Sequence, residues 1–188
     1  EMTALGIVPG DITALGFNVD NLNTCSAMPN YTLKIKGTTA NELTTTFDNG
    51  TYSTVWTDPL FLPVLGWNTH TFTAPFTWNG TDNVLIDICF DLIVTYTQNA
   101  SVYYTQTAGT NTAAYYRSDT QIACGTALSA TLSENRANMQ ITAEVADCLP
   151  PAALTAANIT TTTADLSWTP VGSETLWNLE WGPAGYTQ

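Results

Sequence analysis

The segment from Gly66 to Asp91 constrains the fold of this 188-residue chain more than any other. Its first part, residues 67–73, is rich in threonine and predicts an extended strand. Pro75 cannot donate to a central ladder of backbone hydrogen bonds. The turn residues Asn, Gly and Asp within 79–83 then lead into a second predicted strand, residues 84–90. The segment therefore predicts a β-unit.

Side chains of the second strand alternate between two faces. One face carries Val84, Ile86, Ile88 and Phe90, and the other carries Leu85, Asp87, Cys89 and Asp91. The first set is predicted to face the core. Because Leu85 and Cys89 make the second face partly apolar too, we expect this strand well inside a sheet rather than at its edge.

The same alternation recurs along the first 147 residues. It predicts strands at residues 11–19, 31–36, 52–56, 93–96, 102–105, 113–117 and 139–145. We expect Asp58-Pro59, followed by Pro63, to end the third of these, and only residues 2–7 support a short helical turn. About eight or nine short strands between turns are typical of an antiparallel, jelly-roll-like β-sandwich, here over residues 1–147. One inner layer is predicted to contain Phe17, Leu33, Ile35, Ile86, Ile88, Phe90 and Ile141.

Composition narrows the range of partners. The chain has 44% apolar residues, enough for a core, but only 11% charged residues against about 25% in an average soluble domain. Four Lys plus Arg face sixteen Asp plus Glu, a net charge of −12, which disfavours nucleic acid and anionic membranes as partners. No run reaches the roughly 18 apolar residues of a membrane span. The start at Glu1-Met2-Thr3 has no signal segment, so we expect an excised piece of a longer protein.

Four cysteines and one histidine indicate disulfides rather than zinc, since no C-x-x-C pair is present. In a Lys-poor, Asn/Thr-rich chain they favour an oxidising compartment. Of three possible pairings we favour Cys89 with Cys124 and Cys25 with Cys148, because Cys89 points away from the core face and Cys124 lies in a Gly-flanked loop. Buried free thiols remain the alternative.

A change of composition at residues 148–151, which include Pro150 and Pro151, predicts a linker between domains. Beyond it, Ala153-Leu154-Thr155, the stretch 164–170 and the stretch 176–183 resemble the first three strands of a fibronectin type III domain. In that resemblance Leu166 and Trp168 form the inward pair of the second strand, and Trp177, Leu179 and Trp181 alternate along the third. Residues 152–188 are thus an incomplete domain, and we expect the natural protein to continue past Gln188.

The first domain resembles a module of large extracellular proteins of Bacteroidota. The blocks that carry the resemblance are Ile12 to Val19, Asn30 to Lys36, Gly66 to His70, Phe76 to Thr81, Ile86 to Phe90 and Asn135 to Met139. In such proteins the module stands beside fibronectin type III domains and a type 9 secretion signal. The resemblance implies a secreted or surface-anchored multidomain protein, with no catalytic motif to carry over.

Catalytic chemistry would have to use His70, the only histidine. No Ser or Cys stands in a nucleophile-elbow context, so a structural strand histidine is favoured. Asp87 and Asp91 stand four residues apart on one strand face, which corresponds to about 13 Å of backbone. This exceeds the roughly 5 to 9 Å of a glycosidase pair, and solvated or hydrogen-bonded carboxylates are favoured instead.

Exposed aromatic rings beside Asn, Asp and Thr are typical of carbohydrate-binding modules. The candidate contact residues are Trp56, Trp67, Trp78, Tyr103, Tyr104, Tyr115 and Tyr116. The favoured alternative is that the two tyrosine doublets close the sandwich ends or meet a neighbouring domain. Asp48 and Asp82 lie in acidic turns that could ligate Ca²⁺, although turn chemistry already explains them, and no other cofactor is expected.

The sequence therefore predicts a non-enzymatic structural or adhesive module of a large secreted or cell-surface protein, such as an adhesin or surface filament. Its expected partners are neighbouring domains or copies of the same protein, with glycans or a target cell surface as further candidates, and without nucleic acid or membrane insertion. A carbohydrate-binding module is the first alternative, and an accessory domain of a secreted hydrolase is the second.

Overall fold

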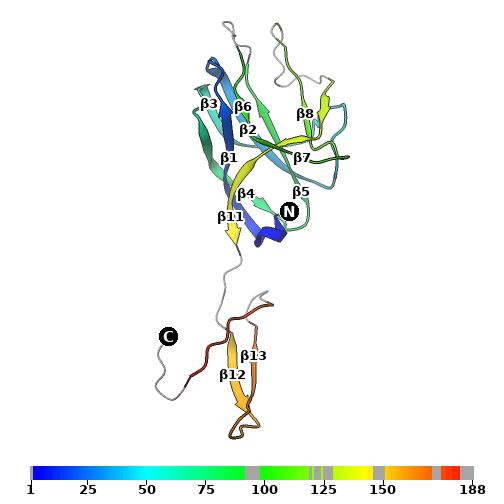
Figure 1. Cartoon of the computed structure of the whole chain (residues 1–188). Helices are drawn as coiled ribbons and strands as arrows, with labels where there is room; N and C mark the ends of the chain where they lie inside the picture. Colours follow the sequence, from blue (N-terminus) through cyan, green and yellow to red (C-terminus); the bar gives the residue numbers. More distant parts are fainter. Residues whose placement is uncertain are drawn as a thin grey trace. The chain divides into compact units, whose positions relative to one another are not determined.

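The computed structural model describes residues 2–91, 98–118, 120, 124, 129–145, 151–170 and 175–182. The chain divides into two compact units, Pro9–Glu144 and Glu1–Val8 with Val145–Gln188. The strand pairs β1–β4, β2–β3 and β2–β5 are antiparallel, and the described part contains one 3₁₀ turn, η1 (Thr3–Leu5), within the range predicted for a helical turn (Figure 1). The predicted all-β class is confirmed. Among the described residues, no helix has the length or the apolar character that crossing a bilayer requires.

The first sheet places β1 (Ile7–Asn21) between β11 (Met139–Val145) and β4 (Gly66–Trp78). A short strand, β6 (Ser101–Val102), also pairs with β1. The pairing of β1 with β4 jumps from Ile12↔Phe76 to Ala14↔Thr71, so β4 carries extra residues, Pro75 among them. Residues in a bulge of a border strand need no partner for their backbone N–H groups. Pro75, which has no N–H group, is therefore tolerated there.

The second sheet has the order β3 (Ser53–Phe61), β2 (Met28–Thr38), β5 (Asn83–Cys89). The strand predicted to lie well inside a sheet, β5, therefore borders this sheet among the described strands, and that prediction is wrong. β3 also runs through Asp58-Pro59, where we expected it to end. As a border strand, β3 tolerates a residue without a backbone N–H group.

Three two-stranded sheets complete the described structure. They are β7 (Tyr104–Gln106) with β10 (Asn135–Ala137), β8 (Ala113–Tyr115) with β9 (Thr131–Ser133), and, in the other unit, β12 (Ala152–Ala157) with β13 (Asp165–Thr169). The predicted strand at 93–96 lies outside the described residues. The predicted third strand around Trp177 is wrong for residues 175–182, which form no strand. Trp177 instead packs edge-on against Trp168, with ring centroids 5.6 Å apart.

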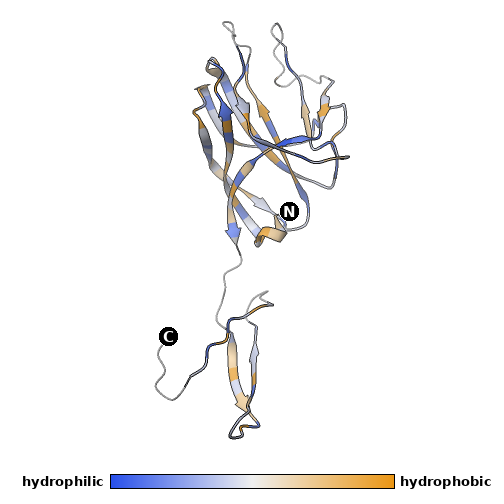
Figure 2. Cartoon of the chain, in the orientation of Figure 1, coloured by the Kyte–Doolittle hydropathy of each residue, from blue (hydrophilic) through white to orange (hydrophobic). Residues whose placement is uncertain are grey.

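The core of the larger unit lies between the two large sheets. β1 contributes the buried residues Leu15, Phe17 and Val19, and β2 contributes Tyr31, Leu33 and Ile35, as the alternation predicted. His70 of the first sheet, which also contacts the ring of Phe17, makes ring contacts with Tyr31 and Trp56 of the second sheet, and these contacts join the layers into a β-sandwich. Figure 2 shows the resulting mixture of hydrophobic and hydrophilic residues along the strands.

A register shift opposite Leu33 and Lys34 makes Val55 an extra residue of β3. Val55 is therefore buried, while its neighbour Thr54 is exposed. A bulge re-aims the side chains that follow it, and strict alternation fails to predict this. Both Val55 and the half-buried Trp56 consequently contribute to the interior.

Along β5, the side chains predicted for the inner layer lie on the expected face of the strand, but they are less buried than predicted. Ile88 pairs with Leu33, and opposite residues share a face, yet Ile88 is 39% exposed while Leu33 is 0% exposed. Phe90 is exposed as well, and Ile86 and Ile141 are half-buried. The border position of β5 explains this, since no further described strand covers its outer side.

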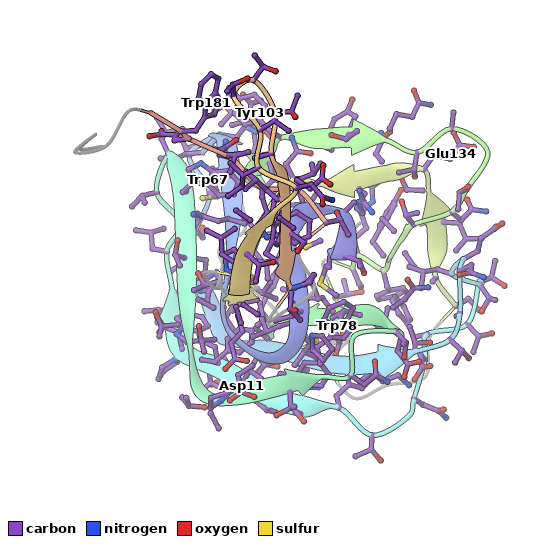
Figure 3. All side chains as sticks on the ribbon, turned by 90° about the horizontal axis from the view of Figure 1, so that it is seen from below. Asp11, Trp67, Trp78, Tyr103, Glu134 and Trp181 are labelled. Atoms are coloured by element: carbon purple, nitrogen blue, oxygen red, sulfur yellow. A yellow bond between two sulfur atoms is a disulfide. The ribbon has the colours of Figure 1, made fainter. Side chains whose placement is uncertain are left out.

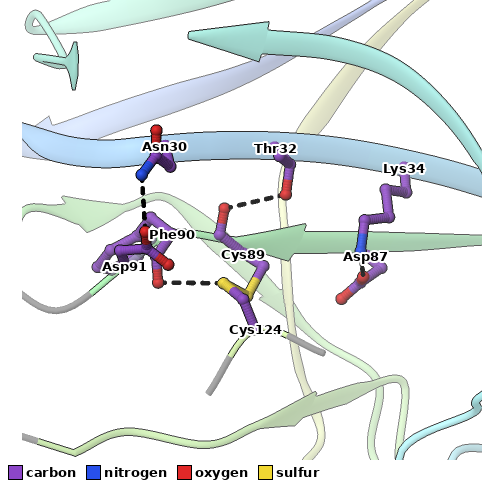
Figure 4. The surroundings of a disulfide bond; sticks show 8 residues. All are labelled: Asn30, Thr32, Lys34, Asp87, Cys89, Phe90, Asp91 and Cys124. Atoms are coloured by element: carbon purple, nitrogen blue, oxygen red, sulfur yellow. Dashed lines mark hydrogen bonds and ion pairs between the residues drawn. A yellow bond between two sulfur atoms is a disulfide. The ribbon is translucent and has the colours of Figure 1, made fainter. Parts of the chain in front are cut away.

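A disulfide joins Cys89 to Cys124, with the two Cα atoms 5.6 Å apart (Figure 4). This is one of the two pairings favoured from the sequence. The Sγ atom of Cys124 lies 3.2 Å from the carbonyl oxygen of Phe90, a close contact without a proton to share because the sulfur is oxidised. Cys25 is half-buried, and its predicted partner Cys148 lies outside the described residues.

Candidate binding surfaces

The tryptophans proposed as sugar contacts do not all reach the surface. Trp78 is buried, and its indole N–H donates to the carbonyl oxygen of Asp82 at 2.7 Å, so its place as a contact residue is wrong. Trp56 is half-buried and packs on Tyr31 and Phe61, with ring centroids 5.7 and 5.6 Å away. Both rings serve the fold because their flat faces are covered by neighbouring groups.

His70 lies in the interior of the sandwich. Its ring centroid is 4.3 Å from that of Trp56, 5.1 Å from Phe61 and 5.7 Å from Tyr31. Burial lowers the pKa of His70, and the nearby negative charge of Asp58 opposes this shift without reversing it. The side chain that any histidine-based reaction would need is therefore packed as a neutral ring.

The acidic candidates each have a structural partner. Asp48 accepts from Lys36 Nζ at 2.6 Å and from the backbone N–H of Gly50 at 2.8 Å, and these interactions lower the pKa of Asp48. Asp82 accepts from the side chain of Asn79 at 2.8 Å. Turn chemistry accounts for both, and the described residues contain no group of three metal-ligating side chains.

The carboxylates of Asp87 and Asp91, the candidate catalytic pair, each contact a side chain of β2 (Figure 4). Asp87 lies 3.4 Å from Nζ of Lys34, its partner across β2 and β5, and Asp91 accepts from Asn30 at 2.7 Å. These contacts tie the border strand β5 to β2.

Two of the candidate aromatic residues, Trp67 and Tyr103, lie on one surface, the outer side of the first sheet. Asn18 pairs directly with Trp67, so their side chains share a face, opposite to that of the buried neighbour Phe17. The backbone N–H of Tyr103 donates to the carbonyl oxygen of Asn18 at 2.9 Å, which places Tyr103 on the other flank of Asn18. Val19 pairs with Val102, so Tyr103, one residue on, points outward like Asn18. Figure 3 labels Trp67 and Tyr103 near each other and Trp78 apart from them.

We call the row Trp67, Asn18 and Tyr103 the outer-face row. Trp67 is 48% exposed and Tyr103 is 50% exposed. A hydrogen bond with Asp20, the extra residue at the irregular pairing of β1 with β6, and the negative charge of Asp20 raise the pKa of Tyr103. Tyr103 is thus half exposed, with its hydroxyl group close to Asp20.

A second exposed feature is apolar. Residues 60–65, which we call the apolar loop, comprise the last two residues of β3 and the link to β4. They include Leu60, Leu62, Val64 and Leu65, each between 58% and 62% exposed. Pro63 is buried and the ring of Phe61 packs against that of His70, so these two residues fix the loop to the interior of the sandwich. Four large aliphatic side chains without an intervening charge form an unusual surface for a soluble domain.

Asn68 fixes the shape of this loop. Its amide oxygen accepts from the backbone N–H of Val64 at 2.9 Å, and its amide nitrogen donates to the carbonyl oxygens of Val64 at 2.7 Å and Gly66 at 3.0 Å. Gly66 takes the left-handed conformation, φ +84°, which favours glycine. The exposed aliphatic side chains are therefore presented by a hydrogen-bonded turn.

The tyrosine doublets lie on different two-stranded sheets. Tyr104 belongs to β7 and is exposed next to exposed Tyr103. Tyr115 belongs to β8 and is exposed, whereas Tyr116 follows it and is half-buried. The expectation that each doublet turns a ring outward agrees with these positions.

Sequence reasoning missed Asn18, Asp20 and the apolar loop. The loop had a readable signal, a charge-free aliphatic run bracketed by Pro59 and Gly66. Asn18 and Asp20 had none, because only the pairing of three separate segments brings them beside Trp67 and Tyr103.

Comparisons with protein-family models, with curated proteins and with solved structures found no match to this chain.

Proposed function

We propose that this chain is a non-enzymatic contact module of a secreted or surface-exposed multidomain protein, and that its apolar loop docks onto the same loop of a second copy. The observation that carries the proposal is the apolar loop itself, with Leu60, Leu62, Val64 and Leu65 exposed on a fixed turn. Burying aliphatic side chains against each other removes apolar area from water, the usual driving force of association.

A second copy fits this surface better than a charged partner does. The run 59–67 contains no charged residue, whereas the whole chain carries −12, so two copies can meet here without bringing like charges together. A patch of four side chains is small, which favours weak, reversible contacts that gain strength by repetition along an assembly.

The proposal includes the finer architecture and the location. We propose a jelly-roll-like topology for residues 1–147 and a fibronectin type III domain that begins at 152. The paired strands β12 and β13, with Trp168 packed on Trp177, support the second assignment. The disulfide between Cys89 and Cys124 supports an oxidising, extracellular location of the kind found for the resembling Bacteroidota modules with type 9 secretion signals.

Sedimentation velocity over a range of concentrations tests the docking. The chain is expected to show concentration-dependent association that Leu62→Asp abolishes, because a carboxylate would be buried in the contact. Leu5→Asp is the matched control, since Leu5 is also an exposed leucine but belongs to η1 and is not part of the loop. A chain that stays monomeric at all concentrations, or an association unchanged by Leu62→Asp, would contradict the proposal.

A further inference from the structure

The outer-face row combines two accessible rings with an amide group between them. β4, β1 and the segment after β6 lie next to each other, and neighbouring strands are spaced by about 4.8 Å, so Trp67 and Tyr103 stand roughly 10 Å apart. Asn18 lies between them and is half-buried. This spacing suits a ligand with two flat, weakly polar faces joined by hydrogen-bonding groups.

The neighbouring residues add neutral hydrogen-bonding groups. Gly16 pairs with Thr69, and a side chain added at Gly16 would meet Thr69 Oγ1 at 3.2 Å and Gln140 Cβ at 3.5 Å. The absence of a side chain at Gly16 therefore lets the Thr69 hydroxyl and the Gln140 side chain approach each other beside the row. Both residues are exposed, so their polar groups remain available.

Charge restricts the ligand further. Asp20 is exposed beside Tyr103, and the chain as a whole carries −12. A carboxylate accepts hydrogen bonds from hydroxyl groups but repels anionic groups. Acidic polysaccharides and phosphorylated ligands are therefore disfavoured at this face.

We infer that the outer-face row is a binding site for a neutral oligosaccharide, with Trp67 and Tyr103 each stacking on one sugar face. Asn18 and Thr69 bond hydroxyl groups of the bound chain, and Asp20 holds the Tyr103 ring in its binding orientation. Tryptophan and tyrosine side chains have few torsions to immobilise on binding, which favours their use as stacking contacts for an extended chain. This site shares no residue with the apolar loop and goes beyond the proposed self-association.

Affinity electrophoresis of the 188-residue chain tests this inference. Native gels are cast with soluble neutral polymers (hydroxyethyl cellulose, mixed-linkage glucan, xylan or glucomannan) and, for comparison, with anionic polygalacturonate. At least one neutral polymer is expected to retard the chain, and polygalacturonate is not. Trp67→Ala and Tyr103→Ala should each weaken that binding about tenfold, as truncation of a central aromatic contact usually does.

Tyr115→Ala is the matched control, an exposed tyrosine of β8 outside the row, and should leave retardation unchanged. Asp20→Asn should weaken binding less than Tyr103→Ala, because the ring remains. Leu62→Asp should abolish self-association but keep retardation, which separates the two proposals. Lack of retardation by every neutral polymer, retardation by polygalacturonate alone, or retardation unaffected by both Trp67→Ala and Tyr103→Ala would overturn the inference.

Discussion

Asn68 binds both backbone groups of Val64, accepting from its N–H at 2.9 Å and donating to its carbonyl oxygen at 2.7 Å. Asn68 is buried, and its side chain faces the loop rather than the solvent. The conformation that exposes the aliphatic side chains of the apolar loop is therefore stabilised by the buried hydrogen bonds of Asn68.

Replacing Asn68 with Ala should lower the free energy of unfolding by about 1–3 kcal/mol, since the backbone groups of Val64 and Gly66 lose their partner. Amide hydrogen exchange at Val64 should accelerate as well. Asn68→Asp is the informative comparison, because it keeps the acceptor for Val64 N–H and loses both donated bonds. Equal stability of the Ala variant and the parent in urea would show that the loop holds its shape without this clamp.

Leu33 and Ile88 test whether the cost of truncating a core side chain follows its burial. The two residues pair across β2 and β5, but Leu33 is fully buried whereas Ile88 is 39% exposed. Leu33→Ala should cost about 2–5 kcal/mol of unfolding free energy, and Ile88→Ala clearly less, because less apolar area returns to water. Denaturant unfolding of both variants gives the comparison. Equal losses would mean that β5 is covered as deeply as β2.

His70 should make stability depend on pH. Its pKa is lowered by burial in the folded state, while the unfolded value stays near 6.5, so between these values the unfolded chain binds more protons. Stability from this group is fully present above about pH 6.5 and is lost as pH falls through the folded pKa, by at most about 1.4 kcal/mol per pH unit. His70→Phe keeps a ring in the cluster and should flatten that part of the curve. A His70→Phe variant with the same pH dependence as the parent would assign the slope to carboxylates.

Reduction should destabilise the larger unit. The Cys89–Cys124 bond closes a loop with a sequence separation of 35 residues, for which chain-entropy reasoning gives about 3–4 kcal/mol. A lower thermal midpoint in reductant is expected for the parent and also for Cys25→Ser, which lacks the thiol of the second predicted pair. A reductant effect that disappears in Cys25→Ser would point to Cys25 instead.

Alternation along β1 and β2 correctly predicted the buried residues of one face, since both strands lie inside their sheets, but it missed Ile12 and Ala14 of β1, which are only 1% and 5% exposed. It failed at β3 and β5 for two physical reasons. The extra residue Val55 changes which side chains point inward, and the depth of Ile88 depends on the position of β5 in the sheet, which sequence spacing does not encode. Trp67 and Trp78 belong to the same strand, β4, yet Trp67 is 48% exposed whereas Trp78 is 4% exposed and donates its indole N–H to Asp82.

The outer-face row illustrates the same limit for sites. Trp67 and Tyr103 were recognisable as candidate ligand contacts by residue type, but their neighbours Asn18 and Asp20 come from another segment. Long-range pairing decides which of many aromatic residues act together, and one sequence contains little information about that pairing.

The most direct test of the central claim is hydrogen exchange followed by mass spectrometry on the chain at low and at high concentration. Docking of the apolar loop onto a second copy predicts slower exchange at high concentration in peptides covering residues 60–67, and no slowing there in Leu62→Asp. Slowing confined to peptides that contain Tyr104 or Tyr115, with residues 60–67 unchanged, would contradict the account and place the contact on the tyrosine doublets.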